Sequence, residues 1–288
     1  MKRKYFSIYD DIEFLKKKFE QRTGYKLNID NPTTFNEKLQ WLKIYNHNPE
    51  YTQMVDKYAV KEYLKEKIGE EYIIPTLGVY DNFDEINFSE LPKQFVLKCT
   101  HDSGSVVIVD DAEKLDKKAV KERLNRALSI NYFWAGREWP YKNVRPQIIA
   151  EKYLCDSSGT ELKDYKFFCF NGSVKLIQVD FDRFVEHKRN VYNRQWEYIP
   201  LVIEFPTEPE RIIRKPICFD EMIEIAEKLS IGIPHVRIDF YVIEDKPIVG
   251  EMTFYHGSGL EKIIPIEWDK ILGDWIELPE KREYDNKT

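Results

Sequence analysis

The stretch RIDFYVIEDKPIVGEMTF, residues 237–254, decides the fold of this chain. It holds two apolar, β-rich runs separated by a short polar segment, a pattern that predicts an antiparallel hairpin. We expect a three-residue turn centred on Asp245. In that register Asp239 lies directly opposite Glu251, and both side chains share one face because side chains alternate with a period of two along a strand.

The opposed carboxylates predict a metal site. Directly opposed side chains have Cβ atoms about 4.5–5.5 Å apart, and two carboxylates at that distance repel each other unless something neutralises them. Oxygen-only ligands favour Mg²⁺ or Mn²⁺ over zinc. The alternative is that the two carboxylates are solvated and that Arg237 is their counter-charge. The same register places Arg237 opposite Thr253. The apolar flanks of the hairpin argue against full exposure and favour the metal.

A candidate anion site lies in FVLKCTHDSGSVVIVD, residues 95–110. Two β-rich runs predict a hairpin with an extended polar tip, and Lys98 ends the first run. The polar tip, with its several small residues, consists of His101, Asp102, Ser103, Gly104 and Ser105. A point cation beside exposed backbone N–H groups can hold an anion such as phosphate. The alternatives are a lysine that extends to water and an ordinary turn.

Two more predicted strands carry polar groups. Lys166 lies on one face of the run DYKFF and needs a partner, either a carboxylate such as Asp164 or a ligand phosphate. The apolar run IIAEKYLCD ends near Leu154. Where this strand leaves its sheet, one free C=O and one free N–H can pair with the edge of an adenine, although an ordinary edge strand is equally compatible.

The remaining sequence predicts an α+β fold of mostly antiparallel sheets flanked by helices, with a helical N-terminal region. Thr34 and Glu37 have the spacing of a helix capping box, and Asn-Gly at 171–172 is a strong hairpin signal. We expect a helical region at 1–75, a small lobe with the phosphate loop at 76–150 and a C-terminal lobe with the metal-binding hairpin at 151–288.

Composition narrows the class of protein. The 288 residues are 42% hydrophobic and 33% charged, with a net charge of -6, which is typical of a soluble globular protein and disfavours a nucleic-acid partner. We expect neither a signal peptide nor a membrane span, because the basic N-terminal segment lacks an apolar region and no apolar run approaches membrane-spanning length. We therefore predict a cytoplasmic protein, with peripheral contact between its basic N-terminus and an anionic membrane as an alternative. The cysteines, Cys99, Cys155, Cys169 and Cys218, lie in apolar segments and predict buried free thiols.

The order of these parts resembles the ATP-grasp fold. A lysine with a small-residue loop comes first, then a strand with EKYL, then a second lysine and RxDF followed by Glu. TFNEKLQWLKIY, DKYAVKEYL, LPKQFVLKCTHDSG, AEKYL, DYKFFCFNG and DFDRF are similar, more specifically, to the TupA-like ATP-grasp family. That resemblance covers about residues 30 to 260, and the family is linked to teichuronopeptide and capsular polysaccharide synthesis.

The resemblance implies ATP and Mg²⁺ (or Mn²⁺) as cofactors and assigns their ligands. Lys98 and Lys166 would hold the nucleotide phosphates under the loop 101–105. Asp239 and Glu251 would bind the metal. The adenine ligands would be the backbone of Lys152 and Leu154, with Glu151 nearby and Asp156 as the ribose-binding acid. The family's usual Asn two residues after the metal Glu is Thr253 here, which weakens a second metal site.

The chemistry implied is ATP-dependent amide formation through an acylphosphate, in which the protein positions groups and neutralises charge. Arg237, with the two lysines, would stabilise the transferring phosphoryl group or the tetrahedral intermediate. Asp182 and Arg183 would contact the substrate, with Arg183 clamping a carboxylate or forming a surface salt bridge. The backbone of Gly257, Ser258 and Gly259 would face the acceptor. The substrates would be a surface-polysaccharide precursor with a uronic acid and an amino acid or amine.

Three other functions are compatible with these residues. Asp180 and Asp182 match the D-x-D pattern with which glycosyltransferases hold Mn²⁺ and a sugar nucleotide. A sugar kinase needs the same lysines and metal as a ligase. A non-catalytic module could stack tryptophans such as Trp134, Trp139 and Trp196 on sugars, and it would not need opposed carboxylates.

Overall fold

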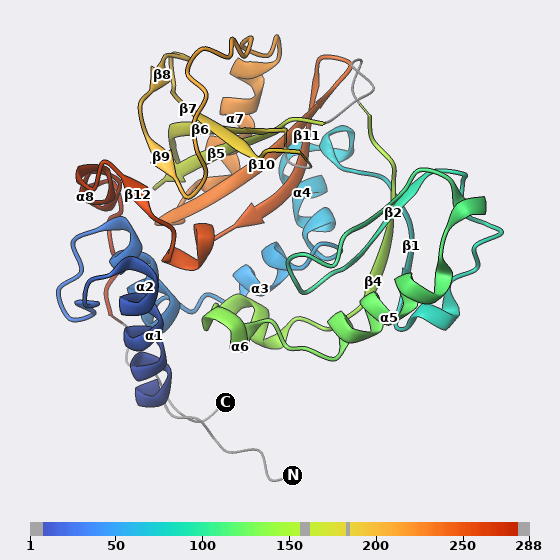
Figure 1. Ribbon diagram of the computed structural model, residues 1–288, viewed down its shortest axis with the longest axis horizontal. Helices are drawn as coiled ribbons and strands as arrows, with labels where there is room; N and C mark the ends of the chain where they lie inside the picture. The colour runs from blue at the N-terminus through green and yellow to red at the C-terminus, as the bar shows by residue number, and fades with distance from the viewer. Residues whose placement is uncertain (1–7, 156–161, 183–184, 282–288) are drawn as a thin grey trace.

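The computed structural model describes residues 8–155, 162–182 and 185–281, and Figure 1 shows their arrangement. The helices are α1 (Ile8–Thr23), α2 (Phe35–Tyr45), α3 (Glu50–Val55), α4 (Val60–Ile68), α5 (Lys117–Leu128), α6 (Phe133–Gly136), α7 (Phe219–Ser230) and α8 (Glu267–Asp274). The strands are β1 (Thr76–Tyr80), β2 (Phe95–Cys99), β3 (Val107–Val109), β4 (Ile148–Lys152), β5 (Asp164–Phe170), β6 (Ser173–Phe181), β7 (Lys188–Asn193), β8 (Tyr198–Ile199), β9 (Val202–Ile203), β10 (His235–Ile243), β11 (Lys246–Thr253) and β12 (Ile263–Ile264).

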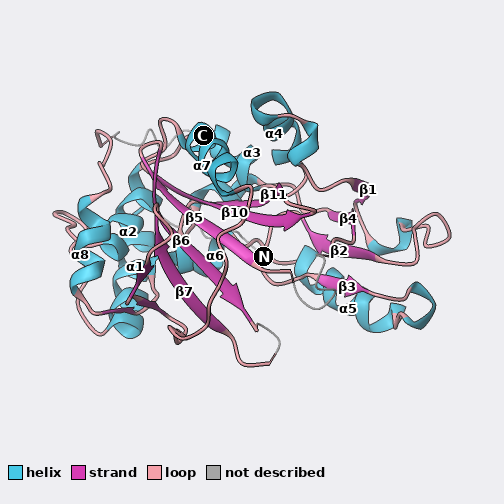
Figure 2. Ribbon diagram, turned by 90° about the horizontal axis from the view of Figure 1, so that it is seen from above, coloured by secondary structure: helices cyan, strands magenta, loops and turns pink. Residues whose placement is uncertain are grey.

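The strands form two main sheets. The small sheet has the order β1-β4-β2-β3, the large sheet has the order β11-β10-β5-β6-β7-β8, and β12 pairs with β9. Pairing within these sheets is antiparallel throughout, and Figure 2 shows the two main sheets side by side. The predicted α+β class with mostly antiparallel sheets is confirmed.

Two separate hydrophobic clusters lie behind these sheets. The larger joins the large sheet to α7 and to the N-terminal helices, while the smaller lies between the small sheet and α5. Because burial of apolar surface stabilises each cluster by itself, the molecule has two lobes. β4 belongs to the small sheet, so the boundary expected after residue 150 runs through this strand.

The β10–β11 hairpin has the predicted register but not the predicted turn. Asp239 pairs with Glu251, yet Ile243 pairs with Lys246, which leaves a two-residue turn. Both turn residues have positive φ, 49° and 61°, as a type I′ turn requires. A β-bulge between Asp239 and the next pair leaves Gly250 without a partner. The bulge adds the residue that the turn lacks, and this restores the register.

Local signals at other element ends are confirmed. Thr34 caps α2 and forms a complete capping box with Glu37. The Asn171–Gly172 turn has φ values of 46° and 83° between β5 and β6, where Phe170 pairs with Ser173. The left-handed conformation that such turns need is accessible to Asn and Gly at low cost.

One prediction about the cysteines is wrong. Cys99, Cys169 and Cys218 are buried free thiols, but Cys155 is exposed because it lies beyond the end of β4. Within residues 8–155, 162–182 and 185–281, none of the helices combines the length and apolar composition that crossing a bilayer requires.

Candidate active site

A row of polar side chains crosses one face of the large sheet. Glu251 on β11 pairs with Asp239 on β10, Asp239 pairs with Lys166 on β5, and Lys166 pairs with Gln178 on β6. Cross-strand partners point to the same face of a sheet. The two predicted metal ligands and one of the predicted phosphate lysines therefore lie side by side.

Asp239 is held by two cations. Arg237 Nε donates to Asp239 Oδ1 and Arg237 NH2 donates to Oδ2, both at 2.6 Å, while Lys166 Nζ donates to Oδ2 at 3.2 Å. Burial alone would raise the pKa of Asp239, but Arg237 and Lys166 outweigh it and the pKa is lowered. Asp239 is therefore ionised, as a metal ligand must be. Arg237 serves as its counter-charge, as the alternative interpretation expected.

Lys166 lies among three aspartates. Its Nζ is 3.0 Å from Asp164, 3.2 Å from Asp239 and 3.6 Å from Asp180. Burial favours the neutral amine, yet the carboxylates outweigh it and raise the pKa of Lys166. The predicted carboxylate partner Asp164 is present. Arg237 also binds Asp239 and Arg189 also binds Asp180, so the three aspartates face three cationic side chains.

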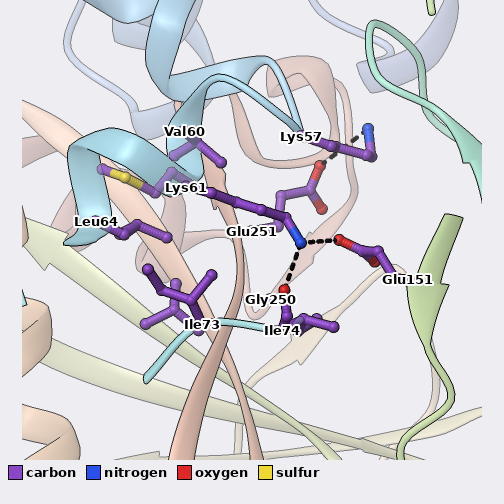
Figure 3. A pocket seen from close by; sticks show the side chains of 11 residues that line it. Lys57, Val60, Lys61, Leu64, Ile73, Ile74, Glu151, Gly250 and Glu251 are labelled. Atoms are coloured by element: carbon purple, nitrogen blue, oxygen red, sulfur yellow. Dashed lines mark hydrogen bonds and ion pairs between the residues drawn. The ribbon is translucent and has the colours of Figure 1, made fainter. Parts of the chain in front are cut away.

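Lys57, in the turn between α3 and α4, is a site residue that the sequence analysis did not assign. Its Nζ lies 3.8 Å from Glu251 Oε1 and also donates to the Asp102 carbonyl, and Figure 3 shows it pointing toward Glu251. Lys57 thus contacts both the loop 101–105 and a predicted metal ligand. Lys57 belongs to the motif DKYAVKEYL, which supported the family resemblance. That motif could have pointed to Lys57, but no role was assigned to its lysines.

Glu151 binds two lysines in the small lobe. Lys98 Nζ is 2.6 Å from Glu151 Oε2 and Lys61 Nζ is 2.7 Å from Oε1. Burial would raise the pKa of Glu151, but Lys98 and Lys61 outweigh it and lower the pKa. Lys61 also donates to the Ile74 carbonyl at 2.5 Å. A small cavity of about 10 Å³, room for about one water, is lined by Lys57, Lys61, Glu151, Glu251 and several apolar side chains (Figure 3).

The loop 101–105 is partly ordered by its own side chains. Ser105 Oγ accepts from the Cys99 N–H at 2.8 Å and donates to Asp102 Oδ1 at 2.7 Å. His101 and Ser105 are buried, whereas Ser103 and Gly104 are exposed. Gly104 has a φ of 102° and open space where a Cβ would be. The exposed half of the loop is therefore where backbone N–H groups can meet an anion.

The predicted adenine strand is not at the edge of its sheet. β4 lies between β1 and β2, and the Lys152 N–H donates to the Pro75 carbonyl at 3.0 Å. The edge-strand interpretation is wrong because the 73–76 segment and β1 cover that side. Leu154 follows the strand outside regular structure. Asp156, the proposed ribose acid, lies outside the described residues, as does Arg183.

The aspartates of the D-x-D pattern are paired within the chain. Asp180 is 2% exposed and accepts from Arg189 Nε at 2.7 Å. Burial would raise its pKa, but His187, Arg189 and Lys166 outweigh burial and lower the pKa. Asp182 accepts from Arg211 NH1 at 2.5 Å. The two carboxylates bind different arginines, which does not support a shared Mn²⁺ site of the glycosyltransferase kind.

The Gly257–Gly259 loop is held by α2. Gln40 Nε2 donates to the carbonyls of Ser258 and Gly259 at 3.0 and 2.7 Å, and Lys43 Nζ donates to Ser258 Oγ at 2.9 Å. Gly259 has a φ of 60°, and a Cβ there would lie 2.9 Å from Leu39 Cβ, so this close approach favours glycine. The helix that carries the motif TFNEKLQWLKIY thus holds the loop 257–259 in place through hydrogen bonds.

The oxygen donors at the hairpin are of the type that hard divalent cations prefer, although Asp239 and Thr253 Oγ1 accept hydrogen bonds from Arg237 here. Asp239 and Glu251 offer carboxylate oxygens and Thr253 offers a hydroxyl, and such ligands suit Mg²⁺ or Mn²⁺. In the part of the chain that the structure describes, no three His, Cys, Asp or Glu side chains gather closely enough to form a metal cluster by themselves. A cation here would need further ligands, which triphosphate oxygens commonly supply.

Several solved structures are similar to the chain. The chain is similar to a RimK domain ATP-grasp protein from Sphaerobacter thermophilus, at 14% identity and a TM-score of 0.44, over 92% of this chain and 95% of that one. It is also similar to a D-alanine–D-alanine ligase from Bacillus anthracis complexed with ATP, at 16% identity and a TM-score of 0.40. This match covers 70% of the chain but only 54% of the ligase, so the chain spans about half the length of that relative.

The family follows from a sequence model. The TupA-like ATP-grasp model matches residues 37–277, so the chain belongs to the TupA-like ATP-grasp family, as its motifs indicated. No protein with curated annotation matches the chain.

Proposed function

We propose that the protein is an ATP- and Mg²⁺-dependent carboxylate–amine ligase that acts through an acylphosphate. Its carboxylate would be a uronic acid of a surface-polysaccharide precursor, and its amine an amino acid or other small amine. The observation that carries the proposal is the convergence of both lobes on Glu251 and Asp239: Lys57 links Glu251 to the loop 101–105, and Lys166 and Arg237 hold Asp239.

The reaction has two steps. A carboxylate oxygen of the first substrate attacks the γ-phosphorus of ATP, the bond to the β–γ bridging oxygen breaks, and ADP leaves. The amine nitrogen then attacks the acyl carbon, the bond to the phosphate oxygen breaks, phosphate leaves and the nitrogen loses a proton. Both steps build negative charge on oxygen, which fixed cations stabilise without reorganisation.

The chain's own residues position and neutralise these groups. Lys98, Lys166 and Lys57 would hold phosphate oxygens under the loop 101–105. The Lys152 carbonyl and the backbone of Leu154, with Glu151 nearby, would bind the adenine, because the Lys152 N–H already donates to the Pro75 carbonyl. Asp239, Glu251 and Thr253 would hold Mg²⁺, which supplies charge neutralisation on the triphosphate. Arg237 would stabilise the phosphoryl group in transfer, while Gly257, Ser258 and Gly259 would face the acceptor, with Asp182 as a further substrate contact.

A compartment that supplies ATP is required, so we place the reaction in the cytoplasm. The described helices include no membrane span, and the proposal needs no nucleic acid or further protein. A lipid-linked precursor would require only peripheral contact with the membrane.

The test is ADP release in the presence of Mg²⁺, screened over amino acids and uronic-acid sugars. We expect release that depends on both substrates and falls at least about a hundredfold in Asp239→Asn and Glu251→Gln, as expected when charge at a phosphoryl site is lost. Glu70→Gln is the matched control, since Glu70 is an exposed acid paired with exposed Lys65.

Product analysis separates the alternatives. An amide and free phosphate support the ligase, whereas a phosphorylated sugar identifies a kinase. Thermal stabilisation by a sugar nucleotide but not by ATP with Mg²⁺ would favour the glycosyltransferase and overturn the proposal.

A further inference from the structure

The guanidinium of Arg237 is almost fully engaged. Besides its two bonds to Asp239, NH2 donates to Thr253 Oγ1 at 3.1 Å and NH1 lies 2.6 Å from His256 Nδ1. Arginine has five N–H donors and no acceptor. Four donors are used, and the fifth, on NH1, has no partner among the described residues. The atom bonded to His256 is therefore the atom left to bind a ligand.

The contact defines the tautomer of His256. Arginine can only donate, so Nδ1 of the imidazole must carry the lone pair and the proton must lie on Nε2. Nε2 is 2.8 Å from Glu261 Oε2, close enough for a strong electrostatic contact but not in the orientation of a hydrogen bond. His256 is 2% exposed, and burial, more than the opposing effect of Glu261, lowers its pKa. A neutral ring with a fixed orientation follows from these contacts.

Glu261 is anchored in turn. Arg189 NH1 approaches Glu261 Oε2 at 3.5 Å, and Arg189 also binds Asp180, which faces Lys166. The backbone carbonyl of Glu261 accepts from Asn36 Nδ2 at 3.0 Å. The side chains of Arg237, His256, Glu261, Arg189, Asp180, Lys166 and Asp239 thus form one closed ring of contacts.

We propose that His256 and Glu261 are a positioning pair for Arg237, with α2 as the clamp that holds them. The proposal rests on the proposed function, in which Arg237 stabilises the phosphoryl group in transfer. Glu261 orients the imidazole of His256, and the imidazole accepts one hydrogen of Arg237 NH1. The other NH1 hydrogen is thereby directed toward the phosphoryl group in transfer. Neither residue touches substrate; both act through Arg237.

The α2 motif gains a role in this way. Asn36 and Gln40 are one helical turn apart, so they lie on the same face of α2, and both bind the backbone of the segment 258–261. A displacement of the loop would move Glu261, and through His256 it would also change the position of the Arg237 guanidinium. Misplacement of a catalytic group by about 1 Å can cost roughly a hundredfold in rate.

Two substitutions at one position separate the roles of the imidazole nitrogens. In His256→Asn the amide oxygen lies close to the position of Nδ1 and can still accept from Arg237. In His256→Gln the amide reaches the position of Nε2, so contact with Glu261 is kept but that with Arg237 is lost. We expect kcat for ADP release to fall about tenfold or more in His256→Gln and by less than about threefold in His256→Asn, with KM for ATP nearly unchanged in both.

Glu261→Gln gives the second arm, and His235→Gln is the matched control, because His235 is equally buried on β10 and its Nδ1 contacts a backbone carbonyl. We expect kcat to fall in Glu261→Gln and to stay within about twofold of wild type in His235→Gln. Equal loss in both His256 variants, or a loss that follows the melting temperature across all four, means a merely structural role and overturns the proposal.

Nitrogen-15 NMR of the histidine rings tests the placement without any substrate. Its expected result at pH 7 is a neutral His256 ring, protonated on Nε2, whose Nε2 signal shifts in Glu261→Gln. A ring protonated on Nδ1 or on both nitrogens overturns the positioning pair. If the wild type never releases ADP, the proposed ligase function fails, and the spectrum still decides whether His256 and Glu261 are arranged as proposed.

Discussion

At the scale of single residues, the site shows how charge survives burial. Lys166, Asp239 and Glu151 would each be costly alone inside the protein, and each has two or more oppositely charged partners within 3.2 Å or less. The sequence predicted Asp164 as a partner of Lys166, because the two share a face of one strand. It could not predict Asp180 or Lys57, whose positions depend on how separate elements meet.

His235 gives a pH prediction at this scale. Burial lowers its pKa from 6.5 to about 3, so between these values the unfolded state binds more protons and stability falls as the pH falls. One such group contributes about 1.4 kcal/mol per pH unit. We expect His235→Phe to narrow the difference in melting temperature between pH 7.5 and pH 5.0.

The difference in melting temperature should become smaller but should not disappear, because burial also lowers the pKa of His47, to about 4. An unchanged difference between the two pH values would show that His235 is accessible to protons in the folded state.

At the scale of elements, the hairpin shows what a sequence pattern can and cannot settle. Alternation placed Asp239 opposite Glu251 correctly, because burial of one face specifies register strongly. The turn length and the bulge were missed, since one compensates for the other and neither alters which side chains share a face. Gly250, the bulged residue, was the available signal.

The turn itself can be improved. Glu244 and Asp245 both adopt positive φ, which costs a residue other than glycine about 1 kcal/mol or more. We expect Glu244→Asn with Asp245→Gly to raise the free energy of unfolding by about 1–2 kcal/mol, measured by urea denaturation. The response to ATP with Mg²⁺ should not change, and a less stable double variant would contradict the type I′ assignment.

At the scale of the whole molecule, the two lobes meet through the N-terminal helices. Ile73 bridges to Val249 of the large sheet, β1 begins the small sheet at Thr76, and Lys61 holds the Ile74 carbonyl between them. The sequence indicated a helical N-terminal region and two lobes from its motifs. It did not reveal that α4 carries the lysine joining them, because a helix pattern does not report which neighbour a polar side chain reaches.

Lys61→Met tests this junction. Glu151 would keep Lys98 but lose its second partner inside the protein, so we expect a loss of about 1–3 kcal/mol of stability. Hydrogen exchange should accelerate most in β1 and β4, and uniform acceleration across both sheets would contradict a local junction. Lys65→Met, one turn further along α4 with an exposed partner, should leave the melting temperature nearly unchanged.

The grip of α2 on the loop before β12 also bears on how the chain is made. Gln40 and the Gly259 carbonyl that it binds are 219 residues apart in sequence. At a synthesis rate of about 5–20 residues per second, roughly 10–45 s separate the emergence of the two partners from the ribosome. Gln40 therefore has no carbonyl partner from this loop until most of both sheets has been synthesised. The contact between α2 and the loop 257–259 is then among the last to form in the nascent protein.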